Sequence, residues 1–284
     1  MKKIILSIFL MFAISILTIY LAGSYFTKPV PMILGKAPNE LNAESVSIEK
    51  IHGWYHQSES SSCVLLLHGV RATRLSMISR AKFLKDLGYS VLLIDFQAHG
   101  ETPGNRITFG YFESNNVKTA VDFLRQTKHC TKVAVIGVSL GGAATLLGDN
   151  PPALDALILE SVYPRIENAV YNRLHARLGI FFARALAPFL YQQIPIRFNI
   201  PLSQLHPIDA IKNVHSPVLI ISGTDDKHTT AEETEALFAA AQEPKSLWLI
   251  KGAVHEDLHR FAGAAYETRV SSFLKQYMID ESSH

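Results

Sequence analysis

Five consecutive residues, Gly137-Val138-Ser139-Leu140-Gly141, decide how this chain is interpreted. They follow the apolar stretch 132–136, typical of a buried strand, and precede residues 142–147, typical of a helix. A Gly-x-Ser-x-Gly between strand and helix predicts a nucleophile elbow, a turn so tight that small residues must flank the serine. The Ser139 hydroxyl would then stand above the sheet, beside a helix N-terminus that favours developing negative charge. A dinucleotide fingerprint is excluded, because Ser139 occupies the place of its second glycine.

An elbow serine needs an acid and then a histidine later in the chain. The strand-like stretch 217–222 leads to Asp226, and the strand-like stretch 246–250 leads to His255. The carboxyl ends of parallel strands meet at one edge of a sheet, where such proteins carry their chemistry. We therefore expect a triad of Ser139, Asp226 and His255, in which His255 accepts the serine proton and Asp226 orients the imidazole.

Attack by such a serine on a carbonyl group also needs two backbone N–H groups, which stabilise the oxyanion that forms. One is that of Leu140, directly after the serine, and the other should come from the loop after the third strand. Residues 63–67 are that strand, so Val70 is the predicted second donor. His68, in the same loop, is expected to make a structural hydrogen bond.

Two alternative assignments of these residues remain open. Asp225 could replace Asp226 as the acid, and so could the more distant Glu160, at the end of the strand-like stretch 156–159. Separately, His255-Glu256-Asp257-Leu258-His259 fits the zinc-protease pattern H-E-x-x-H, which must lie within a helix. Gly252 and a strand lie just upstream, so we expect His255 on a loop, no metal site, and His259 at the surface.

With these motifs in place, the chain resembles the α/β-hydrolase superfamily, in particular serine hydrolases related to serine aminopeptidases and to acyl-thioester hydrolases. The resemblance is carried by Leu67-His68-Gly69-Val70, by the stretch 95–102, by the elbow, and by residues 223–226 with His255. It covers most of residues 60–260. It implies an α/β fold with a mainly parallel sheet of about eight strands, helices on both faces, and a helical cap between strands six and seven.

The resemblance also implies what the protein would do. We expect a serine hydrolase that cleaves a carboxylic ester or thioester of a hydrophobic small molecule through an acyl-enzyme, without a cofactor. An amidase or peptidase of the same fold, or an inactive binding protein, is the alternative. The predicted hydrolase domain is 45–280, and its cap insert, 163–214, contains apolar and aromatic side chains that could line an acyl pocket or simply pack on the core.

The N-terminus predicts a membrane segment. After Met1-Lys2-Lys3 no charged residue occurs until Lys28, and about 20 apolar residues suffice to cross a bilayer. We expect 1–27 to be an uncleaved anchor in the cytoplasmic membrane, or else a signal peptide cleaved before Tyr25 that releases a secreted enzyme. The lysines that precede the span favour an extracytoplasmic catalytic domain. Residues 28–44, rich in proline, would be a linker.

The remaining composition narrows the possibilities further. A net charge of +2 over 284 residues, with no basic stripe, gives no argument for a nucleic-acid partner. Only two cysteines occur, Cys63 and Cys130. In the superfamily the third and fifth strands are neighbours, which would place these cysteines near each other, either bonded or as two thiols.

Overall fold

A computed structural model describes residues 2–149 and 151–278 of the chain. Met1, Asn150 and residues 279–284 lie outside the described residues, and so does the predicted end of the hydrolase domain at residue 280.

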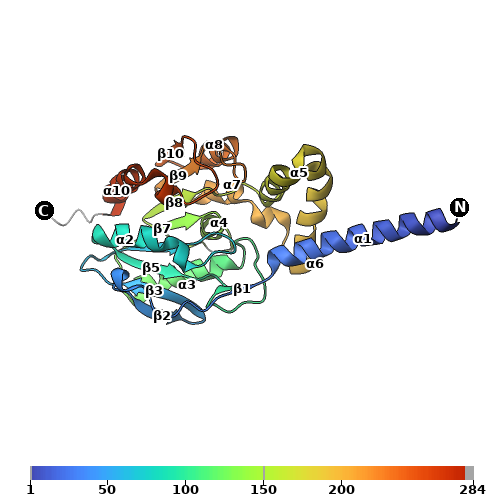
Figure 1. Cartoon of the computed structure of the whole chain (residues 1–284). Coiled ribbons are helices and arrows are strands. Elements are labelled where there is room, and N and C mark those ends of the chain that lie inside the picture. The colour runs from blue at the N-terminus through green and yellow to red at the C-terminus, as the bar shows by residue number, and fades with distance from the viewer. Residues whose placement is uncertain (1, 150, 279–284) are drawn as a thin grey trace.

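The centre of the molecule is an eight-stranded sheet, as the sequence predicted (Figure 1). Its spatial order is β10-β9-β8-β7-β4-β5-β3-β2, and only the β2–β3 and β3–β5 pairs are antiparallel. The strands are β2 (Glu44–Ile48), β3 (Ile51–His56), β4 (Ser62–Leu67), β5 (Ser90–Ile94), β7 (Lys132–Val138), β8 (Ala156–Glu160), β9 (Val218–Gly223) and β10 (Lys245–Ile250).

Helices cover both faces of this sheet because its central strands are apolar on both sides. In β4, Leu65 and Leu67 belong to one buried cluster, whereas Val64 and Leu66 belong to the other. The first cluster packs under α3 (Glu113–Gln126), α4 (Leu140–Leu146) and α8 (Ala231–Ala240), and the second under α2 (Ile78–Asp86), α9 (Leu258–Ala262) and α10 (Ala264–Met278). Short 3₁₀ turns, Asn39–Leu41 and Arg74–Met77, complete this body.

The predicted cap lies between β8 and β9, the sixth and seventh strands of the sheet along the chain. It consists of α5 (Ile166–Tyr191), α6 (Gln193–Phe198), α7 (Pro207–Ala210) and the 3₁₀ turns Leu202–Leu205 and Ile211–Asn213. Gly179 interrupts α5 with a φ angle of 78°, so this element is two helices joined at a bend. A left-handed conformation of this kind favours glycine.

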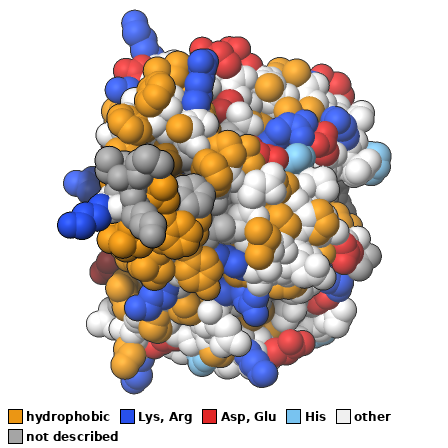
Figure 2. Space-filling view, turned by 90° about the vertical axis from the view of Figure 1, so that its right-hand side faces the viewer, with side chains coloured by type: hydrophobic (Ala, Val, Ile, Leu, Met, Phe, Trp, Pro, Cys, Tyr) orange, Lys and Arg blue, Asp and Glu red, His pale blue; other side chains and the backbone are white. Residues whose placement is uncertain are grey.

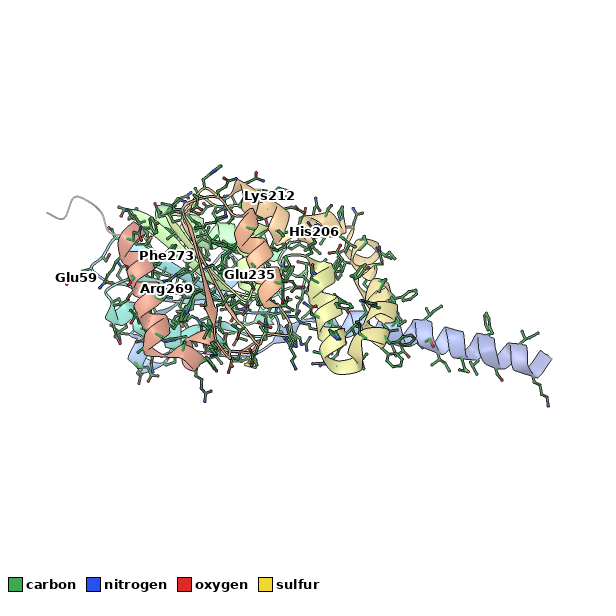
Figure 3. The ribbon with its side chains drawn as sticks, turned by 90° about the horizontal axis from the view of Figure 1, so that it is seen from above. Glu59, His206, Lys212, Glu235, Arg269 and Phe273 are labelled. Carbon is green, nitrogen blue, oxygen red and sulfur yellow. A yellow bond between two sulfur atoms is a disulfide. The ribbon has the colours of Figure 1, made fainter. Side chains whose placement is uncertain are left out.

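The N-terminal residues form one long helix, α1 (Lys2–Thr27), that projects from the body. It leaves on the side of the cap, whereas Glu59 lies at the opposite end of the molecule (Figure 3). Within it, Ile5–Thr27 is long and apolar enough to cross a membrane, a test that a signal sequence passes equally. Beyond α1, the stretch 28–44 contains the two-residue strand β1 (Val30–Pro31), which pairs with β6 (His99–Gly100).

The two cysteines form a disulfide between Cys63 and Cys130, with their Cα atoms 5.9 Å apart. Cys63 is the second residue of β4, and Cys130 precedes its neighbour β7, so the bond joins the two strands at the end of the sheet away from Ser139. This settles the alternative that the sequence left open.

Candidate active site

Ser139 lies in the turn between β7 and α4, with a φ angle of 50° that non-glycine residues rarely adopt. The chain can turn this tightly because its neighbours lack side chains. A Cβ atom on Gly137 would lie 2.5 Å from the backbone nitrogen of Gly142, and one on Gly141 would lie 2.5 Å from the carbonyl oxygen of Leu67. The two glycines of the motif are therefore required by close backbone approach, for the reason that the sequence suggested.

Asp226 and His255 are brought together by the loops after β9 and β10. His255 Nδ1 lies 2.8 Å from Asp226 Oδ2. The other carboxylate oxygen of Asp226 accepts backbone N–H groups of His228, at 2.8 Å, and Thr229, at 2.9 Å. Asp226 thus has three donors, which define the orientation of its carboxylate and, through it, of the imidazole.

The charge of Asp226 is stabilised in this position. Burial alone would raise the pKa of the Asp226 carboxyl, but the hydrogen bond from His255 and its charge, with the N–H groups of Thr229 and His228, lower that pKa below its ordinary value. A buried carboxylate that stays ionised can stabilise a neighbouring imidazolium.

Ser139 and His255 both lie at the carboxyl edge of the parallel strands, after β7 and β10 respectively. Within the described part of the chain, no hydrogen bond joins the Ser139 hydroxyl to His255. His228 lies beside both groups: its ring centroid is 4.9 Å from that of His255, and it lines the same cavity as Ser139. A hydrogen bond between a serine and its catalytic base, such as one from Ser139 to His255, is often long or poorly aligned when no substrate is bound.

The two alternative acids have other surroundings. Asp225 accepts a hydrogen bond from Thr224 Oγ1 and is exposed. Glu160 is buried at the end of β8, where Arg80 donates to both of its oxygens, at 3.0 and 2.6 Å, and the Tyr266 hydroxyl donates at 2.5 Å. In the part of the chain that the structure describes, neither carboxylate forms a hydrogen bond or an ion pair with His255.

The H-E-x-x-H stretch is split between two structural elements, as expected. His255 lies in the loop before α9, whereas His259 is within α9. The two imidazoles have different partners, since His259 Nε2 lies 3.0 Å from Glu267 Oε1. The expectation that His259 is a surface residue was wrong: it is buried against Tyr266, with ring centroids 4.9 Å apart.

The predicted oxyanion donors, Val70 and Leu140, both line the cavity beside Ser139. Leu140 is the first residue of α4, and the first N–H groups of a helix have no acceptor within it. The loop of Val70 lies close to the elbow, since a Cβ atom on Gly69 would be 3.8 Å from that of Ser139.

His68 has the structural role that was expected. Its Nε2 accepts the Phe96 backbone N–H at 3.1 Å, and its Nδ1 lies 2.8 Å from the carbonyl oxygen of Gly69. This pattern requires the neutral ring with its proton on Nδ1. Burial, and to a lesser extent the charge of His99, lower the pKa of His68 to about 3.

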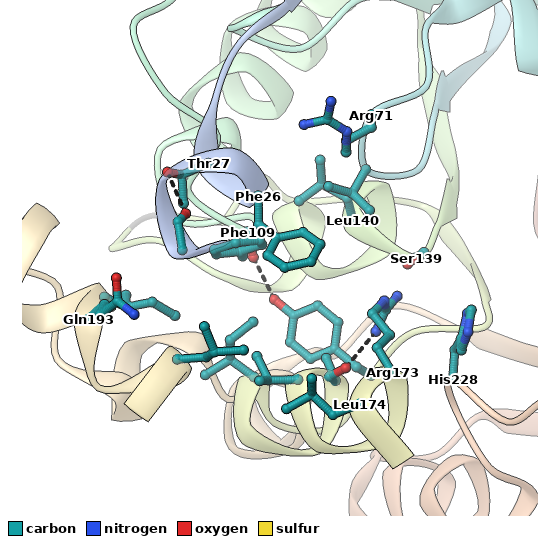
Figure 4. A pocket seen from close by; sticks show the side chains of 18 of the residues that line it. Phe26, Thr27, Arg71, Phe109, Ser139, Leu140, Arg173, Leu174, Gln193 and His228 are labelled. Atoms are coloured by element: carbon teal, nitrogen blue, oxygen red, sulfur yellow. Dashed lines mark hydrogen bonds between the residues drawn. The ribbon is translucent and has the colours of Figure 1, made fainter. Parts of the chain in front are cut away.

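A cavity of about 280 Å³ opens in front of Ser139 (Figure 4). Its walls are mostly apolar side chains of the cap, among them Ile166, Val170 and Ile194. Ser139, Arg173 and His228 lie on one side of it, and Thr27 and Gln193 on the other.

The sequence did not predict two contributions to this cavity. One is the last turn of α1, whose Gly23, Phe26 and Thr27 line it. The i, i+3, i+4 spacing of these residues marks one helix face, but nothing in the sequence pairs that face with the cap. The other is Arg173 with His228, beside Ser139. Burial lowers the pKa of His228, and the charges of Arg173 and His255 lower it further.

Comparison with known proteins agrees with this fold. Residues 58–201 match the family model described as serine aminopeptidase, S33. An uncharacterized protein of Mycobacterium tuberculosis, Rv2307c, is 29% identical over 260 residues, which cover 88% of this chain and 85% of the relative. The Bacillus subtilis protein YqkD is 24% identical over 228 residues, covering 78% and 74%.

Solved structures show the same architecture. The Pyrococcus furiosus esterase Pf2001 superposes with a TM-score of 0.73 at 21% identity, covering 89% of this chain and 99% of that one. The structure of MenH from S. aureus superposes with a TM-score of 0.58 at 16% identity, covering 80% and 99%. With the family match over half of its length, the chain belongs to the serine aminopeptidase S33 family, within the α/β-hydrolase superfamily.

Proposed function

We propose that this hydrolase is a membrane-anchored serine hydrolase that cleaves a carboxylic ester or thioester through Ser139, Asp226 and His255. The observation that carries the proposal is the 2.8 Å contact between His255 and a triply hydrogen-bonded Asp226, at the sheet edge where Ser139 opens into an apolar cavity.

In this mechanism, Ser139 Oγ attacks the carbonyl carbon while His255 Nε2 accepts its proton. The negative charge that forms on the carbonyl oxygen is stabilised by the N–H groups of Val70 and Leu140. His255 then gives the proton to the leaving group, and an acyl-enzyme remains on Ser139. Water, deprotonated by His255, attacks the acyl-enzyme and releases the acid.

The cavity favours an acyl group over a peptide. Apolar walls contribute binding free energy for a hydrocarbon chain, whereas a peptide would leave its backbone N–H and C=O groups without partners there. The name of the matched family refers to aminopeptidases, and the similar Pyrococcus furiosus structure is called an esterase. A panel of matched esters, thioesters and amides separates these activities.

The anchor is proposed to stay attached. Residues before the alternative cleavage point are bonded to the cap: Gln193 Nε2 donates to the Ile19 carbonyl at 3.1 Å, and Arg197 Nη1 donates to Ser24 Oγ at 2.7 Å. Cleavage before Tyr25 would remove Gly23 from the cavity wall. The disulfide favours an oxidising compartment, and therefore a catalytic domain outside the cytoplasm.

The proposal is tested by hydrolysis of short-chain p-nitrophenyl esters by the full-length protein in detergent. Wild type should turn them over, Ser139→Ala should lose at least about 10³-fold in kcat/KM, and the matched control Ser271→Ala, on α10, should match wild type. Equal rates in wild type and Ser139→Ala would reject the nucleophile. Inactivity on esters with turnover of the amides would replace the esterase by an amidase.

A further inference from the structure

The cap carries a group of exposed apolar side chains next to α1. We call this group the cap apolar face; it comprises Leu178, Ile180, Phe181, Phe182, Phe189 and Ile196. Phe181 is 76% exposed and Ile196 is 83% exposed. Figure 2, which views the molecule from the side where α1 projects, shows hydrophobic side chains gathered on this face, with Lys and Arg side chains beside them and at the margins. None of the six lines the cavity.

The attachment of α6 to α1 determines where this face lies relative to a bilayer. Gln193 Nε2 donates to the Ile19 carbonyl at 3.1 Å, and Arg197 Nη2 to the Tyr20 carbonyl at 2.6 Å. Ile19 precedes the end of α1 at Thr27 by eight residues, or about 12 Å at 1.5 Å per residue. The 23 residues of Ile5–Thr27 span about 35 Å, close to the roughly 30 Å of a hydrocarbon core. If α1 crosses a membrane, α6 therefore lies at the depth of the headgroups and the outer acyl chains.

The contacts of Arg197 suit that depth. Its guanidinium also donates to Ser24 Oγ at 2.7 Å and to Gln193 Oε1 at 3.0 and 2.7 Å, and it stacks over the Tyr20 ring at 4.1 Å. A cation in a lipid environment requires such partners. The exposed arginines of the cap, Arg177 and Arg184, could meet anionic headgroups.

We infer that the cap apolar face inserts into the outer leaflet of the bilayer that α1 crosses, and that the cavity takes a long-chain acyl ester directly from that leaflet. We assign lipid as the partner of the cap apolar face because this face continues the exposed apolar surface of α1. Direct transfer of the ester from the leaflet to the cavity is consistent with the cavity walls. These include Gly23 and Phe26 of α1 and Ile194 and Phe198 of α6, the two helices at the proposed membrane surface. The substrate assignment rests on the proposed ester hydrolysis, whereas insertion of the face rests only on the proposed membrane anchor.

Insertion is tested with fluorescence on full-length protein in vesicles of phosphatidylcholine and phosphatidylglycerol with brominated acyl chains, which quench tryptophan on contact. Phe181→Trp should lose more than half of its added emission. The matched control is Leu87→Trp, an exposed position between α2 and β5 at the opposite edge of the sheet, and its added emission should not change. Equal quenching at the two positions, or none at either, would overturn the inference; burial of the face against a second copy would give none.

Uptake from the leaflet is tested with the double variant Phe181→Ser/Phe182→Ser. Its kcat/KM on a soluble short-chain ester should stay within twofold of wild type, while hydrolysis of a long-chain ester embedded in vesicles should fall at least tenfold. Leu87→Ser should change neither rate. Equal rates on the embedded ester, or parallel loss on both substrates, would overturn uptake from the leaflet. If wild type hydrolyses no ester, the proposed function fails, and the quenching experiment still decides insertion.

Discussion

Ser139 has a backbone conformation that few residues other than glycine adopt, and the positions around it explain why it can. The glycines of the motif permit the turn, and their spacing, together with the strand-like stretch before them and the helix-like stretch after them, was enough to predict it. Asp226 was likewise predicted from its place in the loop after β9. Arg173 and His228 were not, because the contact that brings a cap helix to this loop is long-range and leaves no local pattern in the sequence.

At the scale of single residues, the adjacent Asp225 and Asp226 allow a matched pair of variants to be compared. Asp226→Asn should lower kcat on a soluble ester by about 10⁴-fold, because an amide opposite His255 Nδ1 favours the wrong tautomer. Asp225→Asn should change kcat less than twofold, since among the described residues its carboxylate bonds only to Thr224. Steady-state kinetics on folded variants checks this, and the opposite pattern would assign the acid to Asp225.

His68 should stay neutral in the folded protein well below its ordinary pKa. Its pKa of about 3, against about 6.5 in an unfolded chain, means that between these values only the unfolded state gains the proton. The free energy of unfolding should therefore fall as the pH decreases from 6.5 toward 3, by up to about 5 kcal/mol from this residue. Its imidazole NMR signal should not titrate between pH 8 and 4.5. A titration with a midpoint near 6.5 would contradict the assignment.

At the scale of elements, the strands and helices of the body follow from alternation and spacing of apolar residues, whereas the partners of α1 do not. A uniformly apolar helix predicts a membrane segment without indicating which face contacts protein. Here Gly23 allows close approach to α6, because any Cβ atom would collide with the Gln193 side chain. The last turns of α1 therefore belong to the hydrolase body as well as to the proposed anchor.

The disulfide between β4 and the start of β7 should stabilise this part of the sheet. It closes a loop of 67 residues, for which the chain-entropy relation gives about 4 kcal/mol. The double variant Cys63→Ala/Cys130→Ala should lose a stability of that order in chemical denaturation, and added reductant should then have no further effect. Equal stability with and without the bond would contradict its structural role.

At the scale of the whole molecule, the resemblance carried by the motifs implied the mainly parallel sheet of about eight strands and the place of the cap. The spatial order of the strands was not predicted, apart from the third and fifth being neighbours. The disulfide was left open, since two cysteines in a sequence do not show whether they are bonded. The apolar face of the cap was not recognised either, because its residues read equally well as core.

The topology of the molecule gives a further prediction. The full-length protein should remain with membranes after alkaline carbonate washing and retain an N-terminus at or near Met1, because α1 is both apolar and bonded to the cap. Protease added outside the cytoplasmic membrane should digest the catalytic domain. A mature N-terminus at Tyr25 would indicate a secreted enzyme, and protection of the domain would reverse the orientation.

The central claim is that Ser139 is the nucleophile, and covalent labelling followed by peptide mass spectrometry tests it most directly. A fluorophosphonate probe should add to wild type at Ser139 alone, and Ser139→Ala should take up none. Pretreatment with a zinc chelator should leave the labelling unchanged. Labelling that persists in Ser139→Ala, or an adduct on another residue, would contradict the account.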